Sequence, residues 1–304
     1  MVLCVGEILA DMIGAKTAYG VCFERRAGGA PFNVACAVKK LGGQARFYGC
    51  VGDDAVGDFL IDFAASRGLD GRSIARDYAR NTTMAFVELD DAGERSFCFY
   101  RKNTADAHLP HIPDEQIRRA DIIHIGSLML SESHGVEYAV TLAERAHRLG
   151  KRVSFDVNYR GDVFGSADGA LAAYKAVLEI ADIIKLSEDE VSIFTEEYVE
   201  KSLRDKLVVI SLGAHGSEWR YNRRKSIVPT VKVAPVDTTG AGDAFFGGVL
   251  VKLDGMRNCE YSDEILDAAL AFGNACGALT TLGRGAIDAL PDIDDVARVL
   301  AARK

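Results

Sequence analysis

The chain has no run of about 18 uncharged apolar residues, so we expect no helix that spans a membrane. Residues 1–7 carry neither a basic region nor a small-residue cleavage site, and they predict a first core strand instead of a signal peptide. None of the seven cysteines forms a Cys-x-x-Cys pair, and neither they nor the six histidines have the spacing of a metal site. We therefore expect reduced cysteines and a cytoplasmic protein.

Positive charge is in deficit. The chain has 36 Lys and Arg residues and 44 Asp and Glu residues, which gives a net charge of −8. An acidic surface repels nucleic-acid phosphates, and no membrane partner is indicated either. The hydrophobic share of 48% excludes a disordered chain. A length of 304 residues allows one large domain with a small appendage, so the expected partners are small molecules.

Two common nucleotide-binding motifs are also missing. The sequence has no Gly-x-x-x-x-Gly-Lys-Ser/Thr loop, which excludes a P-loop phosphotransferase. It has no Gly-x-Gly-x-x-Gly after the first strand, so a dinucleotide fold has little support.

What the sequence does have is an alternation of short apolar runs with segments of helical period. The runs predict strands at residues 2–5, 45–51, 121–125, 153–157, 183–186 and 207–211. The periodic segments predict helices at residues 33–41, 54–67, 136–149, 170–180, 244–253, 265–279 and 294–302. This order predicts an α/β fold with a mostly parallel sheet covered on both faces.

Two segments interrupt the alternation. Residues 11–27 have no helical period, and residues 84–89 and 96–101 alternate as strands around a turn at 90–93. We interpret them as a small β-layer inserted into the main body. The expected division is a main αβα domain of residues 1–10, 33–83 and 105–304, with a β-lid of residues 11–32 and 84–104.

The segment richest in chemistry is residues 237–248, Asp-Thr-Thr-Gly-Ala-Gly-Asp-Ala-Phe-Phe-Gly-Gly. Gly240, Ala241 and Gly242 precede an apolar helix, so their backbone N–H groups and the helix N-terminus form an anion hole. Asp243 beside it would repel a phosphate that is only held. It suits a reaction in which a hydroxyl loses a proton next to a phosphoryl group. The alternative is an aspartate placed there by the helix dipole alone.

Long motifs now support a family resemblance. Residues 28–35, Gly-Gly-Ala-Pro-Phe-Asn-Val-Ala, with the glycines at 42–43 and 49–57, resemble the N-terminal signature of the PfkB (ribokinase-like) sugar kinases. Residues 237–248 resemble their C-terminal signature, and the likeness covers essentially the whole chain. Residues 99–106 and 185–190 are most similar to the fructokinase-like subgroup. The resemblance implies a three-layer αβα fold with a β-lid and ATP-dependent phosphorylation of a sugar hydroxyl.

For the sugar, the resemblance implies Asp243 as base and binding by Asp11, Gly28, Gly29, Asn33 and Arg101. Short polar side chains suit a polyol, and glycine permits close backbone approach. Alternatives remain: Asn33 as a helix N-cap, Asp11 as a solvated turn residue and Arg101 as a surface arginine.

For ATP, the resemblance implies Asn158 and Arg160 after one strand, the loop residues Ser211, Gly213 and Gly216, and Asn274 beside the adenine. Ser187 and Glu190 occupy the positions of an Asn-x-x-Glu motif, and Glu190 would reach Mg²⁺ through water. Asp237 and Thr239 would bind a monovalent cation such as K⁺. The alternative is a loop tied by hydrogen bonds of Asp237.

The resemblance therefore predicts a fructokinase that uses ATP and Mg²⁺, with K⁺ as a further ion. Two rivals stay open. Another sugar acceptor such as 2-keto-3-deoxygluconate would need positive charge in the lid, and a non-catalytic binding or regulatory protein could keep the fold. An exposed lid edge invites pairing with a second copy, which predicts a homodimer.

Overall fold

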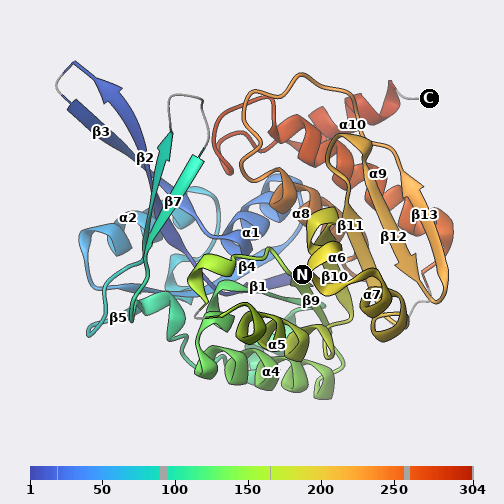
Figure 1. Cartoon of the computed structure of the whole chain (residues 1–304), viewed down its shortest axis with the longest axis horizontal. Coiled ribbons are helices and arrows are strands. Elements are labelled where there is room, and N and C mark those ends of the chain that lie inside the picture. The colour runs from blue at the N-terminus through green and yellow to red at the C-terminus, as the bar shows by residue number, and fades with distance from the viewer. Residues whose placement is uncertain (19, 90–94, 165, 257–260, 303–304) are drawn as a thin grey trace.

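The computed structural model describes residues 1–18, 20–89, 95–164, 166–256 and 261–302. Within them, a central sheet has the strand order β13-β12-β11-β10-β9-β8-β1-β4-β5 (Figure 1). All neighbours from β11 to β5 pair in parallel, whereas β12 and β13 pair antiparallel at one edge. The strands are β1 Val2–Val5, β4 Ala45–Gly52, β5 Ile74–Asp77, β8 Ile122–Ile125, β9 Arg152–Asp156, β10 Ile183–Ser187, β11 Leu207–Ser211, β12 Ser217–Tyr221 and β13 Arg224–Val228.

The sheet is buried on both faces, and its central strands are mostly apolar. In β1, Val2 and Cys4 belong to one core, and Leu3 and Val5 belong to the other. The first face carries α1 Ala30–Lys40, α2 Ala55–Ser66, α8 Ala241–Leu253 and α9 Asp263–Thr280, with α10 Ile293–Ala301 packed on α9. The second carries α3 Asp114–Arg119, α4 Ser133–Arg148, α5 Ala167–Leu178, α6 Glu188–Phe194 and α7 Glu196–Ser202. The predicted three-layer αβα fold is confirmed.

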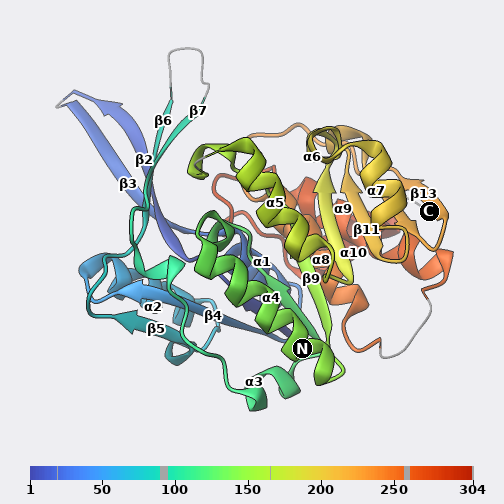
Figure 2. The same cartoon turned by 60° about the horizontal axis from the view of Figure 1, so that its bottom comes forward.

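A second sheet has the order β3-β2-β6-β7 and projects from the body as two hairpins (Figure 2). Its strands are β2 Leu9–Thr17, β3 Gly20–Gly28, β6 Met84–Leu89 and β7 Arg95–Tyr100. This sheet begins before residue 11, and α1 already begins at Ala30, inside the segment expected to form the lid. A proline in the first turn of α1 starts that helix early. The expected turn at 90–93 lies outside the described residues.

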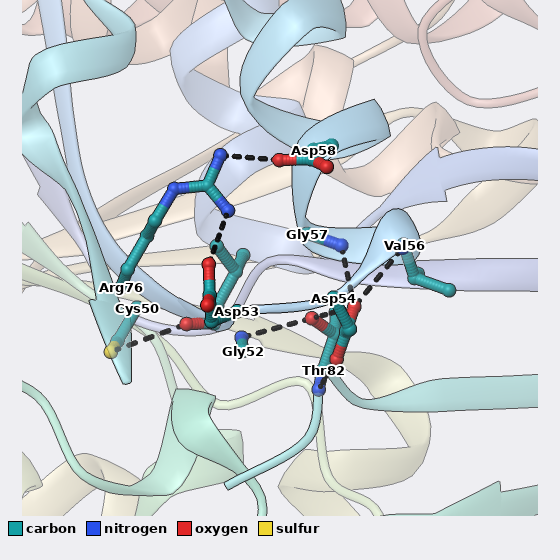
Figure 3. Close-up of polar contacts among 10 residues, drawn as sticks. Cys50, Gly52, Asp53, Asp54, Val56, Gly57, Asp58, Arg76 and Thr82 are labelled. Atoms are coloured by element: carbon teal, nitrogen blue, oxygen red, sulfur yellow. Dashed lines mark hydrogen bonds and ion pairs between the residues drawn. The ribbon is translucent and has the colours of Figure 1, made fainter. Parts of the chain in front are cut away.

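Asp54 joins the main body to the base of this second sheet (Figure 3). As the N-cap of α2, its Oδ1 accepts hydrogen bonds from the N–H groups of Val56 and Gly57 at 3.0 and 2.8 Å. The carboxylate also accepts bonds from the N–H and hydroxyl of Thr82, at 2.8 and 2.9 Å. Thr82 lies just before β6, so a single carboxylate fixes both the start of α2 and the entry to the lid.

None of the helices in the described part of the chain combines the length and the apolar character that a membrane crossing requires. Short 3₁₀ turns cover Gly71–Ser73, Ala105–Ala107, Leu128–Ser131, Gly161–Val163 and Gly213–His215.

Candidate active site

Two cavities meet at the carboxyl edge of the parallel strands, where open α/β sheets bind ligands. The first, of about 410 Å³, lies between this edge and the lid. The second, of about 610 Å³, lies between α8, α9 and the loops after β11 and β13. Both are lined by Thr238 and Gly242. The segment predicted to form the anion hole therefore borders both cavities.

Gly240 is the N-cap of α8 and has the left-handed φ of 75°. A side chain there would stand about 2.4 Å from the Cβ of Ala286. Both this contact and the left-handed φ therefore disfavour any residue other than glycine. Ala241 and Gly242 form the first turn of α8. The N–H group of Ala241 donates to the carbonyl of Thr238 at 3.2 Å. The anion hole at these three residues stays a prediction, and the Ala241 N–H would have to leave Thr238 to bind an anion.

Asp243 follows directly and lines the first cavity. Its Oδ2 accepts a hydrogen bond of 2.8 Å from Nδ2 of Asn33, in the first turn of α1. Burial raises the pKa of Asp243, against the opposing effects of Asn33, Lys185 and Arg160. A carboxylate with a raised pKa is a better proton acceptor.

The alternative interpretation of Asn33 as an N-cap is wrong, because Gly29 caps α1. Asn33 lies inside the helix, where its backbone N–H bonds the carbonyl of Gly29 at 2.8 Å. Its side chain lines the first cavity, and its buried Oδ1 has no hydrogen-bond partner among the described residues. That oxygen is available to accept a bond from a ligand hydroxyl.

Asp11 and Gly29 line the first cavity, and Gly28 supports Asp11 from outside it. A side chain at Gly28 would meet Oδ2 of Asp11 at about 2.4 Å. Gly29 has a φ of 112°, and a side chain there would meet the carbonyl oxygen of Glu7 at about 2.5 Å. The close approach that glycine permits at 29 is therefore to the chain after β1.

Arg101 is not a surface arginine, since only 8% of it is exposed. Its Nε donates to Asp106 at 2.8 Å, and its Nη1 donates to Ser131 at 2.6 Å. Arg101 follows the end of β7 and does not line the first cavity, although Phe99 on β7 does. A direct contact of Arg101 with the sugar stays a prediction; its Nη2 atom has no hydrogen-bond partner among the described residues.

The residues expected at the nucleotide divide between the two cavities. Ser211, Gly213, Gly216 and Asn274 line the second cavity. Asn158 and Arg160 line the first. The residues before position 217 lie at or after the end of β9 or β11, and Asn274 lies on α9.

Asn274 is buried, and its Nδ2 donates to the carbonyl of Val228 at 2.9 Å. It therefore fixes the chain after β13 along one side of the second cavity. Its predicted place beside the adenine is compatible with that position.

Ser187 and Glu190 form a capping box at the start of α6. The two oxygens of Glu190 accept N–H bonds from Tyr159 at 2.6 Å and Ser187 at 2.7 Å. Neither residue lines the two cavities described above. The Glu190 carboxylate therefore ties the loop after β9, which carries Asn158 and Arg160, to the end of β10.

Asp237 holds its loop by hydrogen bonds, as the alternative to a cation site predicts. Its Oδ1 accepts bonds from the N–H and hydroxyl of Thr239 at 2.9 and 2.7 Å, and its Oδ2 accepts the N–H of Gly285 at 3.0 Å. No cluster of three or more His, Cys, Asp or Glu side chains with the geometry of a metal site occurs among the residues that the structure describes.

Sequence reasoning gave no role to Lys185, although this residue faces the anion hole. Lys185 is buried and donates to both oxygens of Asp156, at 3.0 and 3.1 Å. Its Nζ lies about 3.3 Å from where a side chain on Gly242 would begin. Burial opposes its charge, but Asp156, Glu190 and Asp243 outweigh that effect and raise the pKa of Lys185, so the ammonium stays charged.

Comparison with known proteins agrees with this geometry. Residues 1–293 match the family model described as pfkB family carbohydrate kinase. A probable fructokinase-7 of Arabidopsis thaliana is 36% identical over 320 residues, covering 100% of this chain and 93% of the relative.

Two solved structures are also similar. A fructokinase of Xylella fastidiosa with bound ATP has a TM-score of 0.89 and 32% identity, covering 99% of this chain and 98% of that one. A fructokinase of Vibrio cholerae with fructose, ADP and calcium has a TM-score of 0.86 and 30% identity, covering 98% of each chain. With its Gly-Ala-Gly-Asp turn between two cavities, the chain belongs to the pfkB family of carbohydrate kinases, and it is an ATP-dependent enzyme of that family.

Proposed function

We propose that this kinase transfers the γ-phosphoryl group of ATP to a primary hydroxyl of D-fructose, giving fructose 6-phosphate. The observation that carries the proposal is the position of the Gly240–Gly242 turn between the two cavities, with Asp243 facing the first. The first cavity has polar groups suited to a polyol, and the names of the relatives point to fructose. The second cavity takes the nucleotide.

In the mechanism we propose, Asp11 and the free Oδ1 of Asn33 hold sugar hydroxyls, and Asp243 accepts the proton of the attacking hydroxyl. The hydrogen bond from Asn33 orients the Asp243 carboxylate. The backbone N–H groups of Gly240, Ala241 and Gly242 stabilise the negative charge of the transferred group. Closure of the lid excludes water, which would otherwise accept the phosphoryl group.

Lys185 adds a fixed positive charge next to this turn. Asp156 holds its ammonium in place, so little reorganisation is needed when the phosphoryl group arrives. Arg160 lines the same cavity and brings a guanidinium suited to phosphate oxygens.

Metal ions enter this proposal as companions of the nucleotide. Mg²⁺ would arrive with ATP and keep most of its waters, and Glu190 would reach it through one of them. Because both Glu190 oxygens already accept N–H bonds, a direct ligand role is disfavoured. K⁺ would bind near Asp237 and Thr239, because a carboxylate and loop carbonyls suit that ion.

We also propose a homodimer formed through the lid, in a reducing cytoplasm. The strands β3 and β7 leave lid edges unpaired within the described residues, and Val21 is 59% exposed there. Light scattering should give about twice 32.8 kDa. Val21→Glu should give the monomer mass, whereas Ile227→Glu, at an equally exposed site on β13, should leave the dimer intact. A monomeric wild type would contradict the proposal.

The experiment that tests the reaction is ATP turnover with fructose, ribose, 2-keto-3-deoxygluconate and adenosine, with Mg²⁺ and with or without K⁺. A strong preference for fructose supports the proposal. A preference for 2-keto-3-deoxygluconate would leave the role of Asp243 unchanged and would indicate that the arginines of the lid bind the carboxylate of that sugar. Turnover with none of them would favour the binding-protein alternative.

A further inference from the structure

A third carboxylate, besides those of Asp11 and Asp243, belongs to a residue that lines the first cavity, and the mechanism above does not use it. Glu7 follows β1, is only 2% exposed and lines this cavity together with Asp11, Asn33 and Asp243. Its Oε2 atom has no hydrogen-bond partner among the described residues. A buried polar oxygen without a partner is costly, so such an atom in a ligand cavity calls for a ligand group.

The carboxyl group of Glu7 lies against the protein backbone. Behind it, a side chain on Gly126 would meet Oε2 at about 2.5 Å, so the carboxyl packs directly on that backbone. The backbone N–H groups of Glu7 and Leu128 act on the carboxyl by lowering its pKa. Glu7 also lines the first cavity, so the residue borders the sugar site.

Two charged residues act on the pKa of Glu7 in opposite directions. Arg101 lowers the pKa of Glu7 and Asp106 raises it, because these two residues form an ion pair at 2.8 Å beside it. Burial is the larger effect and raises the pKa to about 7. Glu7 is therefore not neutralised by an ion pair of its own.

We propose that the carboxyl group of Glu7 hydrogen-bonds a hydroxyl of the sugar and thereby makes Glu7 a specificity residue of this kinase. The inference rests on the proposed function, since it names a further contact in the same sugar cavity. A hydroxyl fits both requirements of the site: it can donate to the carboxyl group, and it carries no charge into a buried pocket. An acceptor that lacks this hydroxyl leaves the carboxyl group without this bond, and such sites discriminate strongly.

The test is a double-mutant cycle between the enzyme and the sugar. Wild type and Glu7→Met are assayed with fructose and with a set of monodeoxyfructoses, each lacking one hydroxyl. We expect Glu7→Met to raise KM for fructose at least tenfold, with KM for ATP unchanged. For one deoxysugar, the wild type and the variant should then differ less than twofold. That sugar identifies the hydroxyl that Glu7 binds.

Two further variants keep the test decisive. Glu7→Gln preserves the size of the side chain. If Glu7→Met does not fold, the effect of Glu7→Gln on KM must be at least threefold larger for fructose than for one deoxysugar. Glu132→Gln removes one exposed negative charge outside the cavity and should leave every KM unchanged. An equal rise of KM for fructose and all deoxysugars, or no rise at all, overturns the inference.

Failure of the proposed function has a different signature. In that case the wild type phosphorylates no sugar of the panel, and the inference falls with it. If only the inference fails, the wild type still phosphorylates fructose, and the Glu7 variants change KM equally for fructose and for every deoxysugar or do not change it.

Discussion

Lys185 shows how much of the site depends on pairs that are distant in sequence. It lies within β10, whose other residues are mostly apolar, and so it belongs to a strand that periodicity identifies only as core. Its partner Asp156 comes from the neighbouring strand, 29 positions away. A buried lysine is tolerated only with such a partner, and no local pattern of the sequence indicates the pairing.

The role of Lys185 can be separated from its contribution to stability. Lys185→Met alone leaves a buried Asp156 unpaired and should destabilise the protein by about 3–5 kcal/mol. In Asp156→Asn/Lys185→Met that charge is absent, so the double variant should fold. We expect it to keep KM for fructose and to lose about 10²-fold or more in kcat, because the charge acts on the transferred group. A double variant with kcat within threefold of wild type would remove Lys185 from the reaction.

The raised pKa of Glu7 predicts a pH dependence of stability. The folded state holds the proton up to about pH 7, whereas the ordinary pKa is 4.5. Between these values the folded state binds more protons than the unfolded state, so this group makes the unfolding free energy fall as pH rises. Glu7→Gln should therefore become more stable relative to wild type between pH 5 and pH 8, by about 1–3 kcal/mol in urea unfolding. An unchanged difference would mean that Glu7 titrates normally.

At the scale of elements, Gly240 sets the entry to α8. Gly240→Ala introduces both the strain of a left-handed φ and a contact with Ala286. Gly255 is a matched control, since it has the same φ of 75° and open space around it. We expect Gly255→Ala to cost only the backbone strain, about 1–2 kcal/mol, with normal kcat. Gly240→Ala should cost more and lower kcat at least tenfold, measured by urea unfolding and steady-state kinetics; equal effects at both positions would contradict the account.

The regular elements were well predicted where apolar periodicity is long. The strands at 45–51 and 207–211 and the helices at 244–253 and 265–279 were located to within a few residues. The short β5 and the edge strands β12 and β13 were not predicted. Both β12 and β13 are half polar, and such segments carry little periodic signal. The start of α1 was placed late because its first turn contains a proline.

At the scale of the molecule, the site exists only where separate parts meet. Asp243 comes from α8, Asn33 from α1 and Asp11 from the lid strand β2. The motif containing Asp243 was recognisable from the sequence because its glycines are adjacent. Glu7 has only the local signal of a polar residue at the end of the first strand. Its unpaired oxygen appears only when Gly126 and Leu128 pack around it.

The central claim is that Asp243 accepts the proton of the sugar hydroxyl in a chain built to phosphorylate fructose. The most direct measurement compares wild type and Asp243→Asn in ATP-dependent fructose phosphorylation, with fructose binding measured on both by calorimetry. We predict that the variant folds, binds fructose within about threefold of wild type and loses about 10²–10⁴-fold in kcat. A variant that binds fructose and keeps near-normal kcat would contradict the claim.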